Sequence, residues 1–432
     1  MRIRRLRAWA LAVVLLVTAC TERSLPPPAA SPSASPPRET SAPLPSGEPD
    51  PLCRHPEPSP EPPAGSGEEL PPSIAAVAEQ VARVRGLDFK HPVTPERVTA
   101  RRMARLVSGS LDQQFPSDMQ DRRERAWAAI GAIPPDTDLR ESILDFGTSQ
   151  IIGFYDTVTG RLVYVGDASP TPLQELTLAH ELIHALDDQH FDLGRVDELV
   201  RTCRDEGFEA LVSLAEGSAV EMSLRWAQAN LSAEELVELA LEAGAAPQPP
   251  ASVPPFIRDM FLFPYLNGLA FVRALLNEGG QSALDAGFAD PPQSTEQILH
   301  PDKYPDDEPQ AVRVPDLQEK LGSGWRDLDV QDVGEGWLVR LLRLELPASD
   351  AGDAATGWDG GQYRAWSNGP ATAVVLDTVW DSDAEAAEFA ESFEIWAEDR
   401  PVTIERRGPR VRLLFGSDGG ALEDLERALA EG

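Results

Sequence analysis

The stretch PLQELTLAHELIHALDDQ, residues 172–189 of this 432-residue chain, contains its most informative residues. Its apolar residues recur every three or four positions, which predicts an amphipathic helix. Thr171 is a suitable N-cap and Pro172 suits the first helical position, so we expect the helix to begin there. His180 and His184 are four positions apart, so both imidazoles project from one face of the helix and can bind the same metal ion.

Glu181 lies beside the two histidines and completes an HExxH pattern. A glutamate next to a bound metal ion can accept a proton from a metal-bound water molecule, which is the role of a general base. A zinc ion that catalyses hydrolysis needs three protein ligands and an open position for water. The pattern therefore predicts a catalytic Zn2+ site with His180 and His184 as two ligands and Glu181 as the general base.

The third ligand has two kinds of candidate. His190 stands where the pattern HExxHxxGxxH has its third histidine, but Asp187 occupies the position of the glycine that breaks the helix in that pattern. A helix that simply continues would turn His190 away from the other two histidines. The following helical stretch, EALVSLAEGSAVEMSLRW, instead offers Glu209, Glu216 and Glu221.

Glu216 is the predicted third ligand, because its neighbours in the run AEGSA are small. Glycine inside a helix costs about 1 kcal/mol relative to alanine. Gly217 therefore indicates the close approach of another helix, and we expect that neighbour to be the motif helix. Such packing would bring the carboxylate of Glu216 to the metal. Glu209, on the same helix face, and His190 remain alternatives.

Together, HELIHALDDQHFDL and AEGSA resemble a group of secreted bacterial proteins among the gluzincin-like metallopeptidases. The likeness extends to GFYDTVTGRLVYV, FPYLNGLAFVRALL and PPQSTEQILHPDKY and covers roughly residues 73–310. This resemblance implies a zinc-dependent peptidase that cleaves peptide or protein substrates. It also implies that IIGFYD or RLVYV, before the motif helix, lines the substrate groove and pairs with an extended peptide through its edge.

Three further polar residues are weaker candidates for the site. Asp188, four positions after His184, could orient a ligand imidazole or cap the end of the helix. His300 and Tyr304, in PPQSTEQILHPDKY, could stabilise the transition state from a separate segment. Helix packing is the predicted role of Tyr265 and Gly268.

The N-terminus has the composition of a targeting signal. Four arginines among the first seven residues precede the apolar run WALAVVLLV. A basic start followed by a short apolar run is typical of a secretory signal peptide, and the apolar run is too short to span a membrane. Its end, VTAC at 17–20, resembles the lipobox of bacterial lipoproteins, which implies cleavage before Cys20 and a lipid on its thiol. We therefore expect residues 1–20 to be a signal peptide and the rest to be extracytoplasmic, anchored to the cell membrane by that lipid.

Composition and periodicity divide the remainder into three parts. Residues 21–72 are rich in Pro, Ser, Ala and Glu, which predicts an extended linker. Residues 73–309 are predicted to form a mostly helical metallopeptidase-like domain, with a β-hairpin within 151–167 and a helix over 95–108. Residues 310–432 alternate strand-like and helical runs, which predicts a smaller α+β domain. The predicted fold class is α+β.

Acidic residues outnumber basic ones 71 to 38, which gives a net charge of −33. This charge disfavours nucleic acid as a partner, because phosphate backbones are bound by clustered Lys and Arg. The alternative to a peptidase is a zinc-containing envelope lipoprotein that acts as a binding or structural module without cleaving peptides.

Two cysteines remain once Cys20 is lipidated. In an oxidising compartment Cys53 and Cys203 could form a disulfide that ties the linker to the folded part. They could equally be two isolated thiols, because the distance between them does not follow from the sequence.

Overall fold

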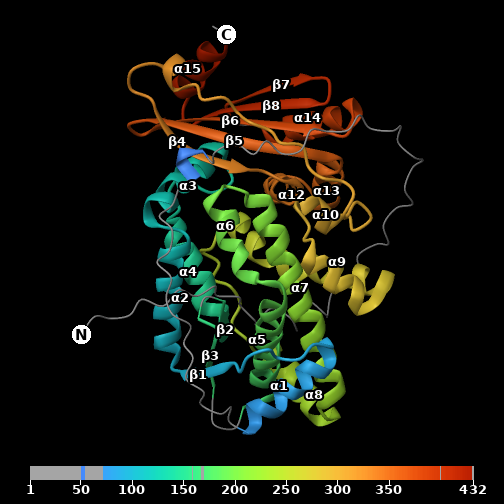
Figure 1. Ribbon diagram of the computed structural model, residues 1–432. Coiled ribbons are helices and arrows are strands. Elements are labelled where there is room, and N and C mark those ends of the chain that lie inside the picture. Colours follow the sequence, from blue (N-terminus) through green and yellow to red (C-terminus); the bar gives the residue numbers. More distant parts are fainter. Residues whose placement is uncertain (1–49, 54–71, 158, 167–169, 399, 431–432) are drawn as a thin grey trace.

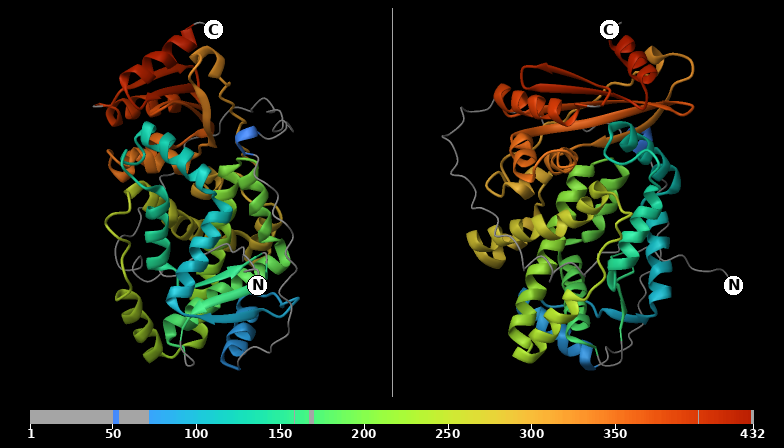
Figure 2. Two further views of the ribbon diagram at one scale, coloured as in Figure 1. Left: turned by 90° about the vertical axis from the view of Figure 1, so that its left-hand side faces the viewer. Right: turned by 180° about the vertical axis from the view of Figure 1, so that it is seen from behind.

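The computed structural model describes residues 50–53, 72–157, 159–166, 170–398 and 400–430. It is an α+β structure, as predicted, with a five-stranded antiparallel sheet at one end and a mostly helical part below it (Figure 1, Figure 2). The predicted signal peptide with Cys20, and most of the predicted linker, lie outside the described residues.

The motif helix α5 (Pro172–Phe191) begins where the sequence predicts. The side chain of Thr171 accepts a hydrogen bond from the backbone of Gln174, and the Gln174 side chain bonds back to the backbone of Thr171. This capping box satisfies N–H groups at the start of the helix that have no partner within it. Apolar residues of α5 pack into one core with α1 (Pro72–Arg85), α7 (Asp205–Asn230) and α9 (Pro255–Ala289).

Helices α7 and α9 cross at two glycines. A Cβ atom on Gly217 would lie 2.1 Å from the carbonyl oxygen of Gly268, and one on Gly268 would lie 1.9 Å from the carbonyl oxygen of Ser213. The expected close approach at Gly217 therefore exists, but the neighbour is α9 and not the motif helix. No side chain fits at either position, so this crossing depends on glycine.

Gly217→Ala should lower the free energy of unfolding by at least about 2 kcal/mol, because the two helices must separate to admit the methyl group. Gly109 in α2 (Ala100–Gln114) is the matched control, since nothing lies within 4 Å of a Cβ added there. Gly109→Ala should raise the free energy of unfolding by about 0.5–1 kcal/mol. Urea denaturation of both variants checks this, and equal effects would contradict the close crossing.

A small sheet precedes α5. Strands β2 (Gly153–Asp156) and β3 (Arg161–Val165) form the predicted antiparallel hairpin, and β1 (Thr94–Val98) pairs in parallel with the other side of β3. The prediction of a helix over 95–108 is therefore wrong at its start, because residues 95–98 belong to β1 and the helix begins at Ala100. Thr99 accepts a hydrogen bond from the backbone N–H of Arg102 and caps α2, so the residues before it are free to pair with β3.

The large sheet has the strand order β4-β5-β6-β8-β7, all antiparallel. Its strands are β4 (Arg326–Asp332), β5 (Trp358–Asn368), β6 (Ala371–Trp380), β7 (Val402–Arg407) and β8 (Arg410–Gly416). Helices α12 (Glu335–Leu342), α13 (Ala348–Ala355), α14 (Asp383–Trp396) and α15 (Gly419–Ala430) accompany it. This pattern matches the strands and helices predicted after residue 310.

The hydrophobic core is continuous between the sheet and the helical part. Trp127 of α3 (Ser117–Ile130) belongs to the same buried cluster as Trp337 and Tyr363, and its indole N–H donates to the side chain of Gln331 at 3.0 Å. Arg123 of α3 is buried as well and donates to Asp329 of β4 at 2.8 Å. Residues before 150 thus support the sheet formed by residues after 325.

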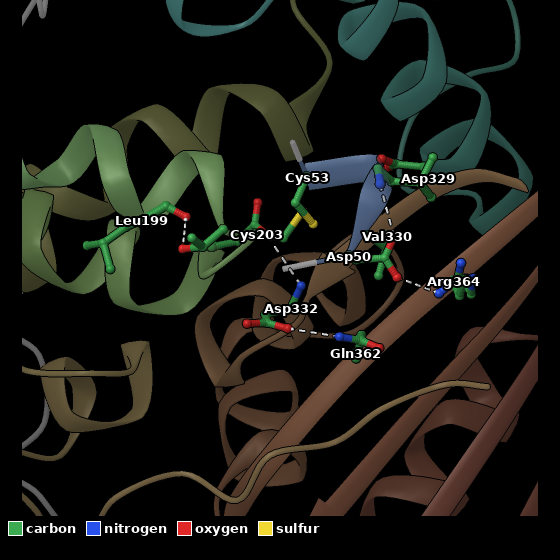
Figure 3. Close-up of a disulfide and its surroundings, with 12 residues drawn as sticks. Asp50, Cys53, Leu199, Cys203, Asp329, Val330, Asp332, Gln362 and Arg364 are labelled. Atoms are coloured by element: carbon green, nitrogen blue, oxygen red, sulfur yellow. Dashed lines mark hydrogen bonds and ion pairs between the residues drawn. A yellow bond between two sulfur atoms is a disulfide. The ribbon is translucent and has the colours of Figure 1, made fainter. Parts of the chain in front are cut away.

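Cys53 and Cys203 form a disulfide, with Cα atoms 5.4 Å apart (Figure 3). The structure thereby decides between the two alternatives that the sequence leaves open. Asp50, three residues earlier, accepts a hydrogen bond from Arg364 of β5 at 2.7 Å. Residues 50–53 of the predicted linker are therefore bonded both to the segment before α7 and to the sheet.

A double variant, Cys53→Ser with Cys203→Ser, should be less stable by about 2–5 kcal/mol, because the disulfide closes a loop of 150 residues. Thermal unfolding should show a lower Tm for this variant than for the wild type. Reductant should lower the Tm of the wild type and leave that of the double variant unchanged. An equal Tm for all samples would contradict the stabilising role of the disulfide.

Candidate metal centre

Three predicted ligands converge between α5 and α7. The Nε2 atoms of His180 and His184 are 2.9 Å apart, and the Oε2 atom of Glu216 lies 3.1 Å and 3.5 Å from them. The exposed fractions of the three residues are 0%, 0% and 1%, so water does not surround the cluster. The structure thus brings Glu216, of the three candidates for the third ligand, to the histidines.

The donor atoms fit a zinc ion in kind and in spacing. Two imidazole nitrogens and one carboxylate oxygen are a donor set of catalytic zinc. Tetrahedral ligands about 2.0–2.1 Å from zinc lie about 3.3 Å from one another. The observed separations of 2.9–3.5 Å bracket that value, so a small adjustment would admit the ion.

The protonation of the cluster also suits a cation. Burial lowers the pKa of His180 to about 4, so its imidazole is neutral near pH 7. Burial alone would raise the pKa of Glu216, but hydrogen bonding to His180 and His184 outweighs it and lowers that pKa below its usual value. A neutral imidazole and an ionised carboxylate are the forms that bind metals.

Tyr265 of α9 reaches the cluster from a third helix. Its hydroxyl donates to the Oε1 atom of Glu216 at 2.9 Å, and its ring stacks on that of His180 with centroids 6.5 Å apart. The predicted role of Tyr265 was packing alone, so sequence reasoning missed this hydrogen bond. A signal was present, because Tyr265 precedes Gly268 by three residues and shares the helix face that meets α7.

Glu181 is fully buried beside the ligands. Within the described residues, neither oxygen of its carboxylate has a hydrogen-bond partner of normal geometry. Burial, and then the charge of Glu216, raise its pKa well above the usual value, against a smaller opposing contribution from the backbone N–H of Tyr155. A Cβ atom on Gly153 of β2 would lie 3.3 Å from the Cγ atom of Glu181, so the strand passes directly over this side chain. A buried carboxylate that pairs with no Lys or Arg among the described residues is unusual in a folded protein, which favours a chemical role for Glu181.

The alternative third ligands lie elsewhere. Glu209 receives two hydrogen bonds from Arg340 of α12, at 2.7 Å and 2.8 Å. His190 bonds through its Nε2 atom to the backbone oxygen of Asp88 at 2.8 Å, near the exposed end of α5. Each is therefore engaged away from the cluster, Glu209 with another helix and His190 with the loop after α1.

Asp188 stabilises the C-terminal end of α5. Its carboxylate accepts hydrogen bonds from the hydroxyl of Tyr155 at 3.0 Å and from the backbone N–H of Leu193 at 2.9 Å. The Nδ1 atoms of His180 and His184 have no hydrogen-bond partner in the part of the chain that the structure describes. The capping alternative for Asp188 is the one observed, and it does not orient a ligand imidazole.

His300 and Tyr304 also make contacts outside the cluster. His300 follows α10 (Thr295–Leu299) and bonds to the carboxylate of Glu335 in α12 at 2.8 Å. The hydroxyl of Tyr304 donates to the backbone oxygen of Asp290. The structure therefore uses this segment to join α10, α12 and the end of α9, and does not bring either residue to the histidines.

Comparison with known proteins gives one match. A family described as a domain of unknown function (DUF8575) matches residues 326–426, which extend from β4 into α15. No curated protein and no solved structure matches the chain. The cluster of His180, His184 and Glu216 lies outside the matched residues, so the match carries no information about it.

Glu216→Ala should abolish stoichiometric zinc binding, whereas Glu209→Ala and His190→Ala should retain it. Glu209→Ala should instead lower the free energy of unfolding by about 3 kcal/mol, because it leaves the buried guanidinium of Arg340 unpaired. Zinc content after dialysis, measured together with thermal unfolding, separates these effects. Zinc loss in Glu209→Ala or His190→Ala, with retention in Glu216→Ala, would contradict the assignment.

Proposed function

We propose that this chain is a zinc-dependent peptidase that acts outside the cytoplasm, tethered to the cell membrane by a lipid on Cys20. The observation that carries the proposal is the buried convergence of His180, His184 and Glu216 beside the buried carboxylate of Glu181. The basic and apolar N-terminus with its VTAC sequence supports the location.

The chemistry divides between the metal and the chain. Bound zinc would polarise the scissile carbonyl and lower the pKa of a water molecule to about 7. Glu181 takes the proton of the attacking water on its carboxylate and delivers it to the leaving nitrogen. Among the described residues no Lys or Arg pairs with its carboxylate, so a proton can be held there between the two transfers.

The sheet order supports a place for the substrate. β3 is the central strand and is paired on both sides, so RLVYV offers no free edge for a peptide. β2 is an edge strand, and its Gly153 lies against Glu181. A peptide that pairs with β2 in an extended conformation would run beside the general base.

The burial of the site favours a second candidate function, a zinc-containing envelope lipoprotein that acts as a binding or structural module. Glu181 has an exposed fraction of 0%, whereas a substrate must reach it. In a peptidase, β2 or its surroundings must move to admit the peptide. In a structural module the site stays closed.

Glu181→Gln separates the two functions, because it preserves the volume of the side chain and removes the general base. The peptidase predicts that the variant keeps zinc and loses hydrolysis by a factor of about 100 to 10,000. Glu221→Gln is the control, since Glu221 lies on α7 and pairs with Arg225 and Arg273. Cleavage of a mixed peptide library, read by mass spectrometry, measures the effect.

Full activity of Glu181→Gln would overturn the mechanism. Stoichiometric zinc in a wild type that cleaves no peptide of the library would overturn the peptidase and support the structural module.

A further inference from the structure

Asp187 lies on the same face of α5 as the two histidines, three residues after His184. Its exposed fraction is 0%. Its Oδ2 atom accepts a hydrogen bond of 2.8 Å from the hydroxyl of Ser218, which follows Glu216 by two residues on α7. The motif helix and the helix of the third ligand are thus joined at a second polar contact close to the cluster.

Arg85, the last residue of α1, completes the environment of Asp187. Its Nε atom donates to the Oδ1 atom of Asp187 at 2.7 Å, and its Nη1 atom donates to Asp285 of α9 at 2.7 Å. The exposed fraction of Arg85 is also 0%. Both oxygens of Asp187 are therefore engaged, one by a cation that balances its charge and one by α7. A buried ion pair of this kind contributes little net stability, but it is directional.

Among the described residues, the ring nitrogens of His180 and His184 that face away from the cluster make no orienting hydrogen bond. In many metal sites the second ring nitrogen donates to a carboxylate or a carbonyl oxygen. Here, in the described part of the chain, the Nδ1 atoms of His180 and His184 have no such partner. The mutual position of α5 and α7, together with the hydrogen bond from Tyr265 to Glu216, therefore sets the ligand geometry. Productive sites require positions correct to about 0.5 Å.

We propose that Asp187 is a positioning residue that acts through Ser218. The hydrogen bond between them fixes the rotation and register of α7 relative to α5, which brings the carboxylate of Glu216 to the two histidines. Arg85 holds Asp187 in place from the other side. This inference rests on the proposed zinc site.

Ser218→Ala tests the inference with little risk to the fold, because it leaves the ion pair of Arg85 and Asp187 intact. Ser223→Ala is the matched control. Ser223 is also fully buried on α7, but within the described residues its hydroxyl bonds to the backbone oxygen of Val220 in the same helix, at 3.0 Å. Both variants are made in the full chain.

The measurements are the zinc Kd, by competition with a chelator, and the visible absorption spectrum of Co2+ bound in place of zinc. Ser218→Ala should raise the Kd by about 10-fold or more and change the Co2+ spectrum. Ser223→Ala should leave the Kd within about twofold of the wild type and keep the spectrum. Asp187→Asn, which replaces the charged acceptor by a neutral one of equal size, should weaken zinc binding in the same direction.

A Ser218→Ala variant with the Kd and spectrum of Ser223→Ala would overturn the inference and leave the zinc site standing. A wild type that binds no zinc would overturn the site itself and the inference with it. Thermal unfolding of the metal-free proteins shows whether each variant is folded. If Ser218→Ala is unfolded, the zinc Kd of Asp187→Asn is the test, and a Kd equal to that of the wild type would overturn the inference.

Discussion

Three consecutive residues of helix α7 contact α5 and α9. The arrangement of the candidate metal centre depends on this packing. Glu216 meets the histidines of α5, Gly217 lies against the backbone of α9, and Ser218 donates to Asp187 of α5. Successive residues of a helix point about 100° apart, so one short segment can serve all these contacts only if both neighbours are held close. The glycine crossing sets the distance to α9, and the polar contacts set the alignment with α5.

The alignment places two carboxylates, Glu181 and Glu216, together in the buried interior. Burial of a charged group costs free energy unless an opposite charge or hydrogen bonds compensate. Within the described residues, Glu216 contacts the two histidines and the hydroxyl of Tyr265, and no Lys or Arg pairs with Glu216 or Glu181. A divalent cation coordinated by Glu216 would balance this charge and favour the ionised form of Glu181, because a bound metal dominates the local electrostatics.

The residues of α5 could be identified from sequence because they obey local rules. Thr171 and Pro172 predict the start of the helix, and the spacing of His180 and His184 places them on one face. Glu216 was identified because small residues surround it, although the helix that those residues accommodate is α9 rather than α5.

What the sequence could not provide depends on packing between distant segments. Asp187 and Asp188 are adjacent and chemically identical, and only the neighbours of α5 decide that Asp187 faces α7 while Asp188 caps the helix end. The contact of Tyr265 with Glu216 likewise exists only where α9 crosses α7. Strand β1 was not recognised from the sequence, because its partner β3 lies far along the chain and pairs with it in parallel.

The most direct test of the proposed zinc site is X-ray absorption at the zinc edge on the purified full chain. We predict one zinc ion per chain bound by two imidazole nitrogens and by two oxygens, one from Glu216 and one from water, at about 2.0–2.1 Å. A fall from two imidazole nitrogens to one in His184→Ala would assign the nitrogens to the cluster. A wild-type protein without zinc, or with zinc bound by four protein ligands, would contradict a catalytic metal centre.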